Sequence, residues 1–359
     1  MDETTLRILD ILSREIGNSL SINELTKKIE KIHGTAHYVN IYNEITSLAT
    51  EDIIKLTKTG RSSIATLNFE NYLLIDLLAE MDLRKKQDFL KGRQEMQMLV
   101  MEIDTYLRDI DFTKSICLIN PERNAKLNKA ELIIHLKKLD NKKIMYDTKL
   151  AINTIIKHLQ MIHTIRIDYL ILEDQTFLNL LKSNEANPLR EMLYNKIATF
   201  HPQDFWLEIR KVIEIGIKIT MEESETHPAK ISEDDIVFNL ARFGYTEFGP
   251  RIKQGKLICI EYIIIATLFN NDSRRIDAIP IIIAKNSDKT NYDLLLFLAQ
   301  KYGFGGRIFG ILRTLRNLVA HGMKEIDEPI RLLETMKIEE IKADKRSMKE
   351  KLRLYNVFE

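Results

Sequence analysis

The sequence has few cysteines and no long uninterrupted apolar run. Among its 359 residues there are two cysteines, Cys117 and Cys259, each in an apolar stretch, which favours buried thiols in a reducing compartment. No cysteine–histidine spacing indicates a metal site, and nothing predicts another cofactor. The longest apolar run, residues 257–269, is interrupted by Glu261 and is too short for a membrane span of roughly 20 residues. Because no signal-like leader is present, we expect a cytoplasmic protein that does not associate with membranes.

The sequence also has no marked excess of positive or negative charge. The 53 Lys and Arg residues are balanced by 52 Asp and Glu residues, which leaves a net charge of +1. A protein without a global positive field must bind nucleic acid, if it binds any, through local surfaces. The sequence has only seven prolines and thirteen glycines, so few residues interrupt helices. The length is typical of about two to three domains. We therefore expect a mostly helical α+β protein.

The first 70 residues contain three helical patterns followed by two strand patterns. In chain order these are residues 4–16, a helix capped by Ser21, residues 38–49, residues 53–57 and residues 64–69. Ser21 and Glu24 have the spacing of a capping box, and residues 58–62, Lys-Thr-Gly-Arg-Ser, have the composition of a hairpin turn. Three short helices and a hairpin predict a winged helix-turn-helix over residues 1–70. In that fold the third helix enters the DNA major groove and the hairpin, or wing, touches backbone or minor groove.

The third helix and the wing carry the candidate contacts with nucleic acid. The helical pattern assigns five apolar residues to the buried side of this helix: Val39, Ile41, Tyr42, Ile45 and Leu48. The candidate binding residues are four polar side chains of the helix and three cations of the wing: Asn40, Asn43, Thr46, Ser47, Lys55, Lys58 and Arg61. From these residues we expect the protein to bind nucleic acid, with double-stranded DNA as the favoured ligand, and to do so as a homodimer.

The charge balance of this segment leaves an alternative open. Residues 1–67 contain eight Lys and Arg residues and nine Asp and Glu residues, and the third helix has no Lys or Arg. Since phosphate contacts supply much of the affinity for DNA, such a module can instead serve in dimerisation or protein docking. A helical connector, residues 71–111, follows. Its stretch 84–93 has five basic residues and one acid, and either extends the basic surface beside the wing or forms a solvated helix face.

Residues 112–215 alternate between strand and helix patterns. Three apolar stretches, SICLIN, AELIIHL and RIDYLIL, are expected as strands, with one helix between the second and third and two helices after the third. We expect a small mixed sheet here. Over SICLINPERNAKLNKAELIIHL and IRIDYLILEDQTFLNLLKSNEANPLREMLYNKIATFHPQDFW, the chain resembles an archaeal family that couples an N-terminal winged helix to a minimal nucleotidyltransferase domain of the polymerase-β type.

The sequence departs from that family at the residues that carry the chemistry. In an active member a Gly-Ser turn holds the nucleotide phosphates, and three carboxylates hold two Mg²⁺ ions. The matching positions are Asn120 and Pro121 for the turn and Lys129, Glu131 and Asp168 for the carboxylates. A proline has no N–H to offer a phosphate, and a lysine opposes a metal ion. The resemblance therefore implies an inactive nucleotidyltransferase-like scaffold, with a residual transferase that uses Glu131 and Asp168 as the alternative.

The last segment, residues 230–359, is expected to be a helical bundle. Arg316 and His321, in Arg-Asn-Leu-Val-Ala-His, resemble the R-x4-6-H signature of HEPN ribonucleases, a family often partnered with minimal nucleotidyltransferases. This resemblance implies acid–base catalysis by His321 and phosphate stabilisation by Arg316. His321-Gly322 is also typical of a helix C-terminus, and Met323 stands where toxin-type HEPN domains have a tyrosine. A HEPN-like bundle without activity and an unrelated bundle are the other interpretations.

The sequence thus predicts a non-enzymatic nucleic-acid-binding protein, similar to a transcription regulator, with an inactive transferase-like scaffold. The alternatives are a metal-independent HEPN-type ribonuclease and a component of a toxin–antitoxin-like system. The remaining histidines show no ligand pattern in the sequence: His33, His37, His135, His158, His163, His201 and His227.

Overall fold

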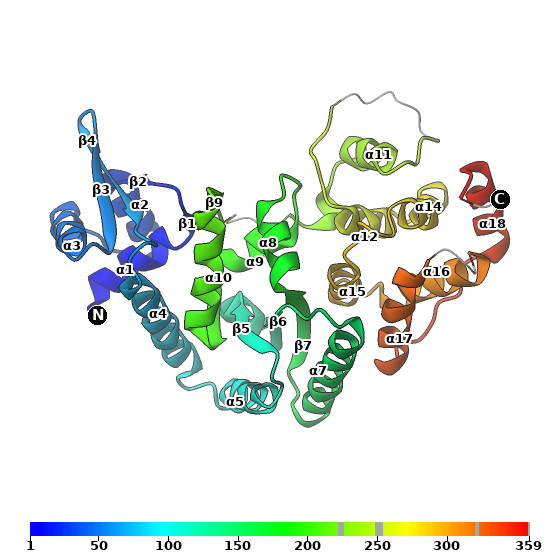
Figure 1. Ribbon diagram of the computed structural model, residues 1–359, viewed down its shortest axis with the longest axis horizontal. Coiled ribbons are helices and arrows are strands. Elements are labelled where there is room, and N and C mark those ends of the chain that lie inside the picture. Colours follow the sequence, from blue (N-terminus) through cyan, green and yellow to red (C-terminus); the bar gives the residue numbers. More distant parts are fainter. Residues whose placement is uncertain (222–225, 248–253, 320–322, 358–359) are drawn as a thin grey trace. The chain divides into compact units, whose positions relative to one another are not determined.

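The computed structural model describes residues 1–359 except 222–225, 248–253, 320–322 and 358–359 (Figure 1). The chain is α+β and mostly helical, which confirms the predicted fold class at this level. It divides into two compact units. Unit 1 comprises Met1–Lys138, Leu172–Lys182 and Leu189–Ser224, and unit 2 comprises Leu139–Ile171, Ser183–Pro188 and Glu225–Glu359. Among the described residues, no helix combines the length and the apolar character needed to cross a bilayer.

Unit 1 begins with three helices and a small antiparallel sheet. The helices are α1 (Glu3–Leu12), α2 (Ile22–His33) and α3 (Tyr38–Thr50), and the strands are β2 (Leu20–Ser21), β3 (Ile54–Thr59) and β4 (Ser62–Leu67). The strand order is β2-β4-β3. The predicted capping box is confirmed, because the Ser21 hydroxyl accepts from Glu24 N–H and the Glu24 carboxylate accepts from Ser21 N–H. Figure 1 shows the β3–β4 hairpin extending beyond the three helices.

The hairpin turn is tighter than the sequence pattern predicts. Thr59 pairs with Ser62, so only two residues form the turn, where residues 58–62 are expected from composition. Gly60 has a φ of 62°, a left-handed value that glycine adopts at little cost. This conformation allows the strands to pair as far as the tip.

Helix α3 buries a narrower stripe than its apolar residues predict. Ile41, Ile45 and Leu48 are buried, whereas Val39 is 64% exposed and Tyr42 38% exposed. The three buried residues follow one another at spacings of four and three, which places them on one side of a helix. The expectation that Val39 and Tyr42 are buried is therefore wrong.

The rest of unit 1 is a sheet flanked by helices. The helices are α4 (Leu73–Leu90), α5 (Gln94–Arg108), α6 (Pro121–Lys126), α8 (Asp174–Lys182), α9 (Pro188–Tyr194) and α10 (Pro202–Glu214). Strand β5 (Thr113–Ile119) pairs antiparallel with β6 (Lys129–Leu136) on one side and with β8 (Lys196–Phe200) on the other. Strand β1 (Glu15–Ile16) pairs antiparallel with β9 (Ile219–Thr220), which joins the N-terminal segment to the end of the unit.

Strand β8 is not predicted from the sequence. Its five residues, Lys-Ile-Ala-Thr-Phe, are all buried, so they lack the alternation of exposed and buried residues that identifies a half-buried strand. The next residue, His201, has a left-handed φ of 45°, and Pro202 then begins α10. A proline suits the first turn of a helix because its missing N–H has no intrahelical partner there.

Unit 2 is largely helical. The longer elements are α7 (Lys142–Ile162), β7 (Arg166–Glu173), α11 (Glu233–Arg242), α12 (Ile260–Asn270), α14 (Ala278–Lys285), α15 (Tyr292–Lys301), α16 (Gly305–Leu318), α17 (Asp327–Thr335) and α18 (Lys345–Leu354). The short elements are η1 (Pro228–Lys230), α13 (Ser273–Ile276) and η2 (Lys324–Ile326). The residues of α12 are buried from Ile260 to Leu268, which makes this helix the centre of the C-terminal core, as the apolar run 257–269 indicates.

Candidate functional site

The exposed side of α3 carries polar and aromatic residues. The four predicted groove-facing residues, Asn40, Asn43, Thr46 and Ser47, are all exposed. Two tyrosines lie on the same helix, with the ring centroids of Tyr38 and Tyr42 6.1 Å apart in a stacked arrangement. The face is therefore rich in hydrogen-bonding groups and aromatic surface, and it has no Lys or Arg.

The cations nearest in sequence to this face lie on the β3–β4 hairpin. Lys58 and Arg61 are exposed at its tip. Lys55 is also exposed, but its Nζ lies 2.8 Å from Oε2 of Glu70, and hydrogen bonding from Lys55 lowers the pKa of the Glu70 carboxyl. Lys55 is thus partly neutralised, and Lys58 and Arg61 carry the net positive charge of the hairpin.

Helix α3 begins without a side-chain cap. His37 occupies the N-cap position, and its side chain accepts no hydrogen bond from the first turn. The first N–H groups of a helix have no intrahelical acceptor and attract anions, because the helix dipole adds a partial positive charge. The first turn of α3 therefore has no side-chain cap for its N–H groups.

The basic stretch 84–93 does not extend this surface as free charge. Arg84 contacts Glu80 at 2.7 Å, Lys85 contacts Asp10, Lys86 contacts Asp104 at 2.5 Å, and Arg93 contacts Glu122 at 2.6 Å. Four of its five cations therefore have carboxylate partners inside unit 1, so the stretch presents less free positive charge than its composition indicates.

The transferase-like positions hold ion pairs and a proline turn. Asn120 has a left-handed φ of 44°, and Pro121 begins α6. On β6, Nζ of Lys129 lies 3.3 Å from Oε2 of Glu131, which is buried. In unit 2, Nε of Arg166 donates to Asp168 at 3.1 Å. The carboxylates of Glu131 and Asp168 thus each have a basic side chain beside them, Lys129 and Arg166 respectively.

Arg316 lies in the last turn of α16 and is bound by an acid. Its Nε contacts Oδ1 of Asp327, and its Nη2 donates to Oδ2 of the same residue at 3.4 Å. His321, the other member of the predicted ribonuclease pair, lies outside the described residues together with Gly322. Met323, two residues further on, is buried.

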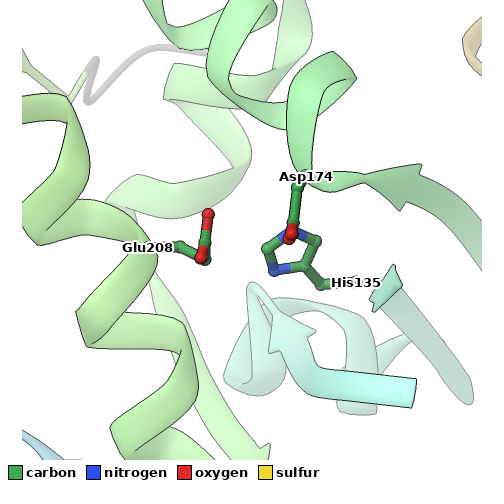
Figure 2. A group of neighbouring side chains, drawn as sticks. All are labelled: His135, Asp174 and Glu208. Atoms are coloured by element: carbon green, nitrogen blue, oxygen red, sulfur yellow. The ribbon is translucent and has the colours of Figure 1, made fainter. Parts of the chain in front are cut away.

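A cluster that the sequence pattern does not indicate lies in unit 1. His135 comes from β6, Asp174 is the first residue of α8, and Glu208 comes from α10 (Figure 2). One ligand atom of each lies within 4.8 Å of those of the other two. Nε2 of His135 is 2.9 Å from Oδ1 of Asp174, and the imidazole stacks on Phe177 with 4.8 Å between ring centroids.

Two lysines complete the charges of this cluster. Nζ of Lys114 lies 3.0 Å from Oδ1 of Asp174 and also contacts Glu208, and Lys211 contacts Glu208 as well. Burial opposes ionisation of Asp174, but hydrogen bonds from His135 and Lys114 outweigh it and hold the pKa of Asp174 well below its usual range. The only sequence signal for this site is a histidine within an apolar strand, since a buried polar group needs a partner.

Comparison of the chain with protein-family models, with curated proteins and with solved structures finds no match. The similarity to nucleotidyltransferases and to HEPN ribonucleases therefore rests on the sequence motifs quoted above.

Proposed function

We propose that the protein is a non-enzymatic nucleic-acid-binding protein, and that residues 1–70 form a winged helix-turn-helix that binds double-stranded DNA. The observation that carries the proposal is the exposure of Asn40 and Asn43 on α3, in a segment that also ends in a cationic hairpin tip. Side-chain amides can pair with the N6 and N7 atoms of adenine in the major groove. The hairpin cations Lys58 and Arg61 supply contacts with phosphate.

The charge distribution sets the strength and salt dependence of this binding. With two net cations on the hairpin and none on α3, one protomer neutralises few phosphates, so affinity falls only shallowly with salt. A homodimer, as the sequence predicts, doubles the number of contacts on a two-fold site. The binding proposed is therefore weak for a single protomer, and the hairpin cations supply its phosphate contacts.

The transferase-like segment is proposed to be an inactive scaffold. The Lys129–Glu131 ion pair supports this, because Lys129 stands at the position of a metal-ligating carboxylate and brings an ammonium there instead of a ligand. Pro121 supports it too, since its ring nitrogen cannot donate to a phosphate. The β1–β9 pair joins the N-terminal module to the chain directly after this segment.

The test is a fluorescence-anisotropy titration of the full chain with labelled duplex DNA of mixed sequence at low salt. A Lys58→Ala/Arg61→Ala variant is compared with Lys91→Ala, an exposed lysine at the end of α4 in the same unit. We expect the hairpin variant to lose about tenfold or more in affinity and the control to bind like the parent protein. Equal binding by all three proteins contradicts the role of the hairpin.

A further inference from the structure

The cluster of His135, Asp174 and Glu208 contains buried polar atoms without hydrogen-bond partners in the described part of the chain. They are Nδ1 of His135 and Oε2 of Glu208. Both side chains are almost fully buried, with exposures of 2% and 1%. A third such atom is Oγ of the fully buried Ser115, a residue that pairs with His135 across β5 and β6. A bound water or ion satisfies buried polar atoms of this kind.

The two carboxylates of the cluster already bind a cation in the form of a lysine ammonium. Asp174 and Glu208 bring two carboxylates together, and the Lys114 ammonium contacts both. Lys114 therefore stands where a positive ion would bridge the same two oxygens. Lys211 binds Glu208 from a side chain that is 52% exposed, so it can leave for solvent. Figure 2 shows the His135 ring facing both carboxylates from a third element.

The donor set matches the coordination chemistry of a transition metal. An imidazole nitrogen and two carboxylate oxygens are ligands for zinc-like ions, with metal–ligand distances of about 2.0–2.2 Å. Tetrahedral coordination at these distances places ligand atoms about 3.4 Å apart. The ligand atoms of the cluster lie within 4.8 Å of one another, and rotation of the side chains can bring them to the shorter spacing that a bound metal needs. Three protein ligands leave one position for water.

We propose that His135, Asp174 and Glu208 bind a single divalent transition-metal ion of the zinc class, and that the Lys114 ammonium fills this site when no metal is bound. Metal and ammonium compete for the same carboxylates. Lys114 is 12% exposed, so its flexible side chain has a way out when the metal enters. The site is separate from the proposed DNA-binding residues and does not depend on them.

The test uses the full-length protein, stripped with EDTA and dialysed against Zn²⁺, with the bound metal measured by mass spectrometry. We expect one equivalent in the parent protein and none in His135→Gln. His201→Gln is the matched control, since His201 is an exposed histidine 3.4 Å from Asp204 in the same unit, and this variant should keep its metal. Equal metal contents in the parent and His135→Gln proteins overturn the proposal.

A second variant is expected to bind Zn²⁺ more tightly, a result that misfolding cannot produce. Lys114→Met removes the competing charge and leaves two carboxylates that attract a cation, so Zn²⁺ affinity should rise about tenfold or more. The added Zn²⁺ should also raise the melting temperature of Lys114→Met more than that of the parent protein. Unchanged or weaker Zn²⁺ affinity in Lys114→Met overturns the competition between ammonium and metal.

Discussion

Lys196 and Asp82 form a buried ion pair inside unit 1, with Nζ of Lys196 2.6 Å from Oδ2 of Asp82. The same oxygen accepts a hydrogen bond from Nε1 of Trp206 at 2.8 Å, and the ammonium lies 4.1 Å from the centroid of the Trp206 ring. Burial lowers the pKa of Lys196 against the opposing charge of Asp82. Lys196 lies on β8, Asp82 on α4 and Trp206 on α10, so these contacts join a strand of the sheet to two helices that flank it.

Asp82→Asn should destabilise unit 1 by about 3–5 kcal/mol, because it leaves the Lys196 ammonium buried without a counter-charge. Trp206 is the only tryptophan of the chain, so its fluorescence during urea unfolding reports this region directly. The double variant Asp82→Leu/Lys196→Met should be more stable than Asp82→Asn, since it leaves no unpaired charge. A double variant that is less stable than the single one contradicts the account of this pair.

Glu261 should make unit 2 less stable as the pH rises. Its side chain is buried, and Oε1 accepts from the N–H of Asn291 at 2.6 Å. Burial raises the pKa of Glu261 from 4.5 to about 7. Because the folded-state pKa is the higher one, the stabilisation is complete below pH 4.5 and is lost between that pH and about pH 7, by about 3 kcal/mol in all.

The measurement for Glu261 is the free energy of unfolding of the parent protein and of Glu261→Gln between pH 5 and pH 8. Glutamine does not ionise, so the variant should lack the part of the pH dependence that Glu261 contributes. Parallel pH profiles for the two proteins rule out a raised folded-state pKa at this position.

Gly310 allows a close approach of the chain to α16. A Cβ built on Gly310 would lie 1.8 Å from the carbonyl oxygen of Ile341, a backbone atom that no side-chain movement can relieve. Gly310→Ala should therefore destabilise the protein by about 1–3 kcal/mol in thermal or denaturant unfolding. Gly305→Ala, in the first turn of the same helix, meets only an ordinary contact of 3.5 Å with Ile338 and should be neutral or slightly stabilising. Equal stability of the two variants contradicts this packing.

The two thiols should be inert while the protein is folded. Both cysteines are buried, and burial raises the pKa of Cys117 to about 12 and that of Cys259 well above its usual value. Reaction with a thiol reagent at pH 8 should be negligible in buffer and should reach two equivalents in denaturant. Rapid modification of either cysteine in the folded protein would contradict the burial of Cys117 in β5 and of Cys259 at the N-cap of α12.

Local signals account for the parts of the fold that the sequence predicts. The capping box of Ser21 and Glu24 and the glycine at position 60 act within a few residues, so α2 and the hairpin can be located from the sequence alone. Packing decides the rest. Strand β8 is buried along its whole length and has no alternation, and Val39 is exposed because no neighbouring element covers its side of α3.

The candidate functional residues likewise divide into those that local spacing predicts and those that only the tertiary fold brings together. Exposure of Asn40 and Asn43 follows from helical spacing, which is a local property. The cluster of His135, Asp174 and Glu208 depends on three elements that the tertiary fold brings together, so spacing along the chain gives no sign of it. Three of the four carboxylate partners of stretch 84–93 are also remote in sequence, as Lys85 and Asp10 show, so a count of charges alone overestimates the basic surface there.

The most direct test of the proposed function is hydrogen–deuterium exchange of the full chain with and without duplex DNA at low salt. Bound DNA should slow exchange in α3 and the β3–β4 hairpin, residues 38–62, and leave α12 in unit 2 unchanged. The protection should disappear in the Lys58→Ala/Arg61→Ala variant. DNA binding without slower exchange in residues 38–62, or with protection confined to other segments, would contradict the proposal that this surface binds nucleic acid.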